Sequence, residues 1–342
     1  MKNTYTTPAD FWRERDFGTK ISATFEFIGA HWRPLSKCLL YFVLPCALLM
    51  GIGLGLFTNS IYNQMGGVMA GRQVGGPAQI AQPVGASPFN AFNIGGMAAG
   101  FLGSTLSFLL LVGTVYGYLR ARLYLPATEP ITPSRVWAEL RARLGRMVGG
   151  TLLLLLLGSL SFGLVFGALM LFWSLLAGGS VAGPMLALVL GYVVMGYISV
   201  SLGLYYPVLW LEDTDVFAAI GRCFQLIKGQ WWATCGMLLT AMFLQSMFAI
   251  VFAIPQYAVM MGKMLQLPAL DSDALGMVAQ CFYAIGIIFT YCIPLLALAF
   301  QYLNLVERQE GIGLRLLVDQ LGQGQAPAAE SGHYHPDELG EY

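Results

Sequence analysis

Five long stretches of this chain contain no Lys, Arg, Asp or Glu, and these gaps constrain its fold more than any other feature of the sequence. They cover residues 38–71, 73–119, 147–211, 229–262 and 274–306. A helix needs about 20 predominantly apolar residues to cross the hydrocarbon core of a bilayer, and each gap is long enough for that. The sequence therefore predicts an all-α integral membrane protein.

The gap at 147–211 has room for two spans, because Gly178-Gly179-Ser180 and Gly183-Pro184 predict a turn in its middle. The total is six transmembrane helices in three hairpins. Their predicted positions are about 39–57, 97–118, 148–176, 185–211, 231–254 and 277–305. Residues 1–36 are then a cytoplasmic leader with an interfacial helix, residues 37–305 the six-span domain, and residues 306–342 a cytoplasmic helix followed by a disordered tail.

The composition excludes several classes of protein. Only 11% of the residues are charged and 57% are hydrophobic, whereas soluble proteins carry about 25% charged residues. Lys plus Arg and Asp plus Glu number 18 each, so the net charge is zero and no nucleic-acid partner is indicated. A large soluble catalytic domain is excluded on the same grounds.

Basic residues predict the orientation, because they concentrate on the cytoplasmic side of membrane proteins. With both termini inside, 16 of the 18 basic residues are cytoplasmic, and only Arg72 and Lys263 lie outside. The predicted location is the bacterial inner (plasma) membrane, with an N-in, C-in topology and several membrane passes.

A cytoplasmic amphipathic helix is predicted before each hairpin, within residues 20–35, 132–147 and 214–228. In the first, the apolar face contains Ile21, Phe25, Ile28, Trp32 and Leu35, and Lys20 lies largely off that face. In the third, Ile220, Phe224 and Ile227 are expected to face the bilayer or the helix bundle. A surface helix and two spans thus recur three times, which suggests a threefold repeat; alternatively, any six-helix protein forms three hairpins.

The predicted spans contain no acidic, basic or histidine residue of the kind that proton relays and many ion-coupled transporters use. HExxH, Walker-type and GxSxG motifs are absent, so we expect no enzyme activity, no metal and no cofactor. His333 and His335 lie in the predicted disordered tail.

We therefore expect a non-enzymatic scaffold or accessory subunit that contacts membrane lipids, and other membrane or cytoplasmic proteins, through its cytoplasmic helices. The alternative is a transporter or flippase-like protein for a lipid or amphipathic substrate. The candidate contact residues are basic or tryptophan side chains near the cytoplasmic ends of the spans: Trp32, Arg33, Arg141, Arg143, Arg146, Arg222, Lys228 and Trp231.

Two segments resemble a known family. Residues 215–232, with Arg222, Lys228-Gly229 and Trp231-Trp232, resemble an Ala-Ile-x-Arg-Ser-x-x-Leu-x-Lys-Gly-x-Trp/Phe-Trp stretch. That stretch occurs in the six-helix membrane domain fused to some glycerophosphodiester phosphodiesterases and in stand-alone membrane proteins. Residues 302–311 are similar to the family's closing Tyr-x-Asp-x-Arg-x-Arg-x-Glu-Gly pattern, with Asn304 in place of Asp.

The resemblance covers about residues 15–320 and implies a six-helix membrane body without an assigned activity. It does not imply phosphodiesterase activity, because that domain needs paired histidines and acidic metal ligands. This chain has only three histidines and lacks the length for a second domain.

Overall fold

The structure, a computed structural model, describes residue 5 and residues 8–73, 93–125, 129–176, 182–265 and 267–322. All regular secondary structure in these residues is α-helical. The helices are α1 (Pro8–Phe11), α2 (Phe17–Phe42), α3 (Leu44–Gln73), α4 (Ile94–Tyr124), α5 (Pro133–Leu176), α6 (Ala182–Leu202), α7 (Tyr205–Leu211), α8 (Val216–Ile227), α9 (Trp231–Met264), α10 (Asp273–Glu310) and α11 (Ile312–Gly322).

Six helical segments are long and apolar enough to cross a membrane, so the prediction of a polytopic membrane protein is confirmed. They are Leu44–Asn63, Ile94–Tyr124, Pro133–Trp173, Leu188–Leu211, Trp231–Met264 and Asp273–Glu310. The predicted tail, with His333 and His335, and residues 74–92 between the first two predicted spans lie outside the described residues.

The first span begins at Leu44, about five residues later than the charge gap suggests. Helix α2 continues through Leu39 to Phe42, and a new helix starts immediately after Val43. Pro45 explains the break, because proline has no backbone N–H to continue the hydrogen bonds of the preceding helix. In the first turn of a new helix that missing donor costs nothing.

Helix α2 also differs from the predicted surface helix in the side chains that it buries. Lys20 is only 5% exposed, although its position in the sequence lies off the predicted apolar face. Its Nζ donates to Gln301 Oε1 at 2.8 Å, and Gln301 Nε2 donates to Thr234 Oγ1 at 2.9 Å. Burial lowers the pKa of Lys20, and the nearby Arg308 adds to this effect. Helix α2 therefore contacts α10 through a buried polar side chain as well as through apolar ones.

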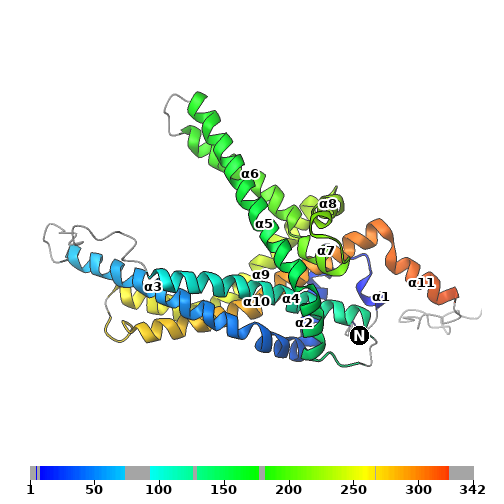
Figure 1. The fold of residues 1–342 in the computed structure, drawn as a ribbon, viewed down its shortest axis with the longest axis horizontal. Helices are drawn as coiled ribbons and strands as arrows, with labels where there is room; N and C mark the ends of the chain where they lie inside the picture. Colours follow the sequence, from blue (N-terminus) through cyan, green and yellow to red (C-terminus); the bar gives the residue numbers. More distant parts are fainter. Residues whose placement is uncertain are drawn as a thin grey trace, which may run out of the picture.

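Four long helices lie side by side, and the remaining hairpin projects away from them (Figure 1). In the group of four, α3 packs against α4, α9 against α10, and α10 also against α3. The projecting hairpin is formed by α5 and α6, which pack against each other. Helix α5 also contacts α4, where Leu140 and Met147 lie against Gly113. Each of the three predicted helix pairs is therefore in contact, but only the first and third pairs pack against each other side by side.

Glycines allow α3 and α4 to approach each other closely. A Cβ atom built on Gly53 would lie 2.2 Å from the backbone nitrogen of Gly100, and one built on Gly103 would lie 2.4 Å from that of Met50. Such close contacts through small residues are typical of helix pairs in membranes. These glycines therefore set the distance between the two helices.

Helix α5 is longer than the hydrocarbon core of a bilayer is thick. At 1.5 Å per residue, the helix from Val148 to Leu176 measures about 43 Å, against a hydrocarbon core of about 30 Å. A helix of this length fits the core when it tilts. Most of the apolar side chains in this part of α5 are exposed, as expected for a surface that faces lipid.

At the end of the bundle far from α7 and α8, polar side chains join the first and third hairpins. Lys263 is fully buried, and its Nζ donates to Asn63 Oδ1 at 3.1 Å and to Asp273 Oδ1 at 2.5 Å. Asn59 Nδ2 donates to the backbone oxygen of Asp273 at 2.8 Å. The ends of α3, α9 and α10 therefore lie on the same side of the molecule.

Candidate functional site at the charged end of the bundle

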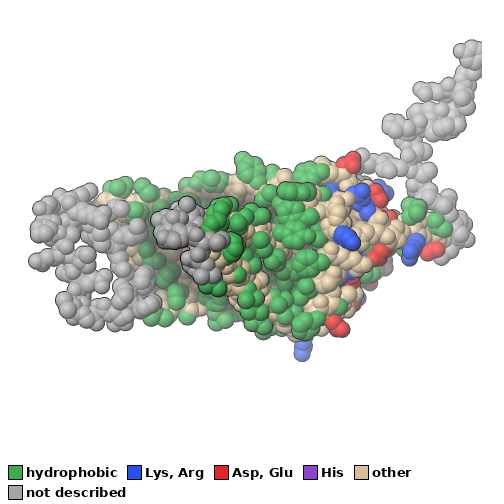
Figure 2. All heavy atoms as spheres, turned by 90° about the horizontal axis from the view of Figure 1, so that it is seen from above, with side chains coloured by type: hydrophobic (Ala, Val, Ile, Leu, Met, Phe, Trp, Pro, Cys, Tyr) green, Lys and Arg blue, Asp and Glu red, His purple; other side chains and the backbone are tan. Residues whose placement is uncertain are grey.

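Charged side chains gather at one end of the molecule, and the surface beyond them is mainly apolar (Figure 2). We call this region the charged end; it comprises residues 8–20, 31–37, 118–125, 129–146, 212–231 and 302–315. Contacts between distant parts of the chain hold it together. Arg15 meets Asn304, Arg120 meets Asp213, and Arg222 meets Glu310.

Asp213, in the loop between α7 and α8, is surrounded by arginines from two other helices. Its Oδ1 accepts hydrogen bonds from Arg143 Nε at 3.0 Å and Arg146 Nη2 at 2.8 Å, and its Oδ2 accepts one from Arg120. Glu139 joins the group through Arg143 Nη1, at 2.5 Å. We call these five residues the arginine clasp, because they join α4, α5 and the α7–α8 loop.

The clasp keeps Asp213 ionised. Partial burial raises the pKa of Asp213, but hydrogen bonds from Arg143, Arg146 and Arg120 outweigh that effect and lower it to about 2. Asp213 also has a φ of 53°, a left-handed conformation that aspartate tolerates better than most residues. Of the predicted contact residues, Arg143 and Arg146 are therefore engaged within the protein.

Arg222 is engaged in a second internal network. Its Nε lies 3.0 Å from each carboxylate oxygen of Glu212, and its Nη2 contacts Glu310. The Tyr302 hydroxyl donates to Glu212 Oε1 at 3.0 Å. Arg222 therefore joins α8 to α10, whereas Lys228 is exposed.

The other predicted contact residues lie in varied positions at the same end. Arg33 and Arg141 are exposed, as Lys228 is. Trp32 is 46% exposed, and its ring lies 5.7 Å from that of Phe289. Trp231 is half-buried, stacks on Tyr197 with ring centroids 5.4 Å apart, and donates from Nε1 to the Tyr197 carbonyl at 3.3 Å.

Helix α8 has two apolar faces rather than one. Ala219, Cys223, Leu226 and Ile227 pack inward, so Ile227 faces the helix bundle as expected. Phe217 is 74% exposed and Phe224 39%, and Lys228, which directly follows the helix, is also exposed. Beyond it, Trp232 is 82% exposed at the start of α9. Exposed aromatic and basic side chains are therefore neighbours along this edge.

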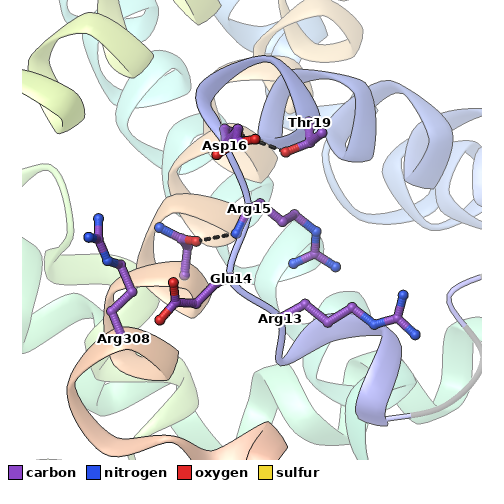
Figure 3. Close-up of a pocket in the computed structure, with 7 residues that line it drawn as sticks. Arg13, Glu14, Arg15, Asp16, Thr19 and Arg308 are labelled. Carbon is purple, nitrogen blue, oxygen red and sulfur yellow. Dashed lines mark hydrogen bonds between the residues drawn. The ribbon is translucent and has the colours of Figure 1, made fainter.

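A pocket of about 410 Å³ lies between the leader and the last part of α10 (Figure 3). Its lining residues are Arg13, Glu14, Arg15, Asp16, Thr19, Asn304 and Arg308. The Arg15 backbone N–H donates to Asn304 Oδ1 at 2.6 Å, and the Arg15 guanidinium donates to the Phe11 carbonyl at 2.9 Å. Arg308 Nη1 donates to Gln230 Oε1 at 3.3 Å.

Sequence analysis identified neither this pocket nor Asp213 as a centre of contacts. The available signal for the pocket was the alternation of basic and acidic residues at positions 13–16. The missing information was that position 304 packs against position 15. In the described part of the chain, no group of three or more His, Cys, Asp or Glu residues has an arrangement that could hold a metal ion.

The chain was compared with protein-family models, with curated proteins and with solved structures, and no match was found. The similarity to the membrane domain of the glycerophosphodiester phosphodiesterases therefore depends only on the residues quoted above. What the structure defines is the class: a polytopic α-helical membrane protein.

Proposed function

We propose that this chain is a non-enzymatic protein of the bacterial inner membrane, with both termini in the cytoplasm. It acts as a scaffold or accessory subunit whose charged end contacts anionic lipid and partner proteins. The absence of acidic, basic and histidine residues from the predicted spans supports the non-enzymatic part of this proposal.

One observation carries the lipid contact: some basic residues of the charged end are engaged within the protein, whereas others are exposed at its surface. The arginine clasp and Arg222 make ion pairs within the protein. Arg33, Arg141 and Lys228 are instead among the outward, exposed cations, and in the sequence Lys228 is four residues from the exposed Phe224 and four from the exposed Trp232. Exposed cations near an anionic membrane surface gain about 1 kcal/mol each, and aromatic side chains favour the same interface.

The proposed orientation follows from the same distribution of charge. The charged end contains nearly all the basic residues of the described chain, whereas Lys263 lies at the opposite end, paired with Asp273. Because basic residues are retained on the cytoplasmic side, we place the charged end in the cytoplasm.

The lipid contact is tested by neutralising three of the outward cations together, as Arg33→Gln, Arg141→Gln and Lys228→Gln. The native chain should retain anionic phospholipid above its bulk fraction after extraction, as measured by mass spectrometry of the bound lipid. We expect a loss of about fivefold in anionic-lipid affinity per residue, so that the variant retains little more than the bulk fraction.

The matched control is Asp215→Asn, which neutralises an exposed acid at the same end and should leave the enrichment intact. If the triple variant retains as much anionic lipid as the native chain, these cations do not contact the membrane and the proposal fails.

A further inference from the structure

The pocket between the leader and α10 presents charges of both signs on one side. Figure 3 shows Glu14 and Arg308 extending to the same side of the leader, whereas the guanidinium groups of Arg13 and Arg15 extend to the other. Asp16, Thr19 and Asn304 also line the pocket, and Asp16 lies beside Thr19. A ligand in this space can therefore meet the carboxylates of Glu14 and Asp16, the guanidinium group of Arg308 and the amide of Asn304.

Helix α9 indicates how deep in the membrane this pocket lies. Its exposed apolar side chains run from Leu239 to Met261, a length of about 33 Å, which matches the hydrocarbon core. The exposed Trp232 precedes this run, at a position typical of the membrane interface. Phe17, next to Asp16, packs against Gly236, where an added Cβ would lie 3.7 Å from the Phe17 ring. The pocket therefore opens at the level of the lipid headgroups.

A contact of Arg308 also places the pocket at the level of the lipid headgroups. The Arg308 hydrogen bond to Gln230 brings the pocket wall next to Trp231 and the start of α9. Asn304 is 2% exposed, so the inner wall of the pocket belongs to the packed bundle rather than to a surface loop. Acyl chains that descend from this pocket would follow the exposed apolar face of α9.

We propose that this pocket binds the phosphoethanolamine headgroup of a membrane phospholipid. Arg308 and the Asn304 amide face its phosphate, and Glu14 and Asp16 face its ammonium group. Charge-assisted hydrogen bonds of both kinds are among the stronger polar contacts in proteins. The inference relies on the proposed function in one respect, that the charged end lies at the membrane surface.

The two carboxylates determine the headgroup class. A purely anionic headgroup would leave Glu14 and Asp16 facing further negative charge. A choline headgroup would bring a cation that has no N–H to donate, whereas the primary ammonium of ethanolamine combines a positive charge with N–H donors that carboxylates accept. The soluble counterpart, free phosphoethanolamine, has the same groups but no acyl chains to hold it beside α9.

The test is native mass spectrometry of the full chain with equal amounts of phosphatidylethanolamine, phosphatidylglycerol and phosphatidylcholine. We expect the native chain to retain phosphatidylethanolamine preferentially. Glu14→Gln and Arg308→Gln should each weaken that retention about tenfold, the effect of losing one charge-assisted hydrogen bond. Arg308→Lys should restore part of it, because the charge remains.

Asp215→Asn and Arg315→Gln are matched controls, since they neutralise exposed charges of the same sign outside the pocket. The thermal midpoint of each variant is measured first, and lipid retention is compared only between variants whose midpoints match that of the native chain. Equal retention of the three lipids by the native chain would overturn the proposal, and so would unchanged retention in both pocket variants. Displacement of the lipid by an equimolar amount of free phosphoethanolamine would show that the acyl chains add nothing to binding and that the ligand is soluble, which also overturns the proposal.

This experiment separates the pocket from the proposed function. If Glu14→Gln and Arg308→Gln have no effect while the Arg33, Arg141 and Lys228 variant loses anionic lipid, the pocket assignment fails and the surface contact stands. The reverse result would retain the headgroup site and remove the surface contact.

Discussion

Replacing Gly53 with alanine is expected to lower the stability of the folded protein by about 3 kcal/mol, the upper part of the usual range for overpacking. The new Cβ would lie 2.2 Å from the Gly100 nitrogen and 2.7 Å from its Cα. These are backbone atoms, so no side-chain rotation relieves the contact. Helices α3 and α4 would have to separate along their shared surface.

Gly158→Ala is the matched control. It adds the same methyl group to a membrane helix, but nothing lies within 4 Å of the position. Alanine favours a helix by about 1 kcal/mol over glycine, so this variant should be unchanged or slightly more stable. The measurement is the thermal midpoint in detergent, read from the fraction that stays monodisperse after heating. Equal midpoints for the two variants would mean that α3 and α4 are not in close contact.

Replacing Arg222 with glutamine is expected to cost about 2–3 kcal/mol. Removal of one partner from a buried ion pair costs about 3–5 kcal/mol, and the partial exposure of this network reduces that figure. The Arg222 side chain is 20% exposed and that of Glu212 is 19% exposed. The substitution leaves Glu212 and Glu310 facing each other without the cation that separates them. Arg222→Lys should be intermediate, because lysine keeps the charge but not the planar fork.

Lys228→Gln serves as the control at the C-terminal end of the same helix, because this exposed lysine should contribute little to stability. The thermal midpoint of each variant is compared with that of the native chain. If Arg222→Gln is as stable as Lys228→Gln, Arg222 is not a structural tie and belongs with the outward cations.

The six spans were predictable because their signal is local. An unpaired charge in the hydrocarbon core is so costly that its absence over about 20 residues marks a span without knowledge of the neighbouring helices. The break before Leu44 was also present in the sequence, as Pro45, but a helix ending and another beginning inside one apolar stretch does not change the charge pattern.

The sequence did not predict which basic side chains are buried or which partners they contact. Lys20 is buried because Gln301 lies opposite it on α10, 281 positions later. Arg222 and Lys228 differ because only Arg222 reaches Glu212 and Glu310. Helical periodicity places a side chain on a face, but it does not say which partner covers that face. The pocket at Arg308 was missed for the same reason.

Cysteine labelling of intact cells tests the central claim, that the charged end lies in the cytoplasm. In a chain whose six cysteines are replaced by alanine, Ser272→Cys and Arg141→Cys each introduce one exposed thiol, at opposite ends of the molecule. A maleimide that does not cross membranes should label the cysteine at position 272 in intact cells. It should label the one at position 141 only after the membrane is permeabilised. Labelling at position 141 in intact cells, with protection at position 272, would contradict the account.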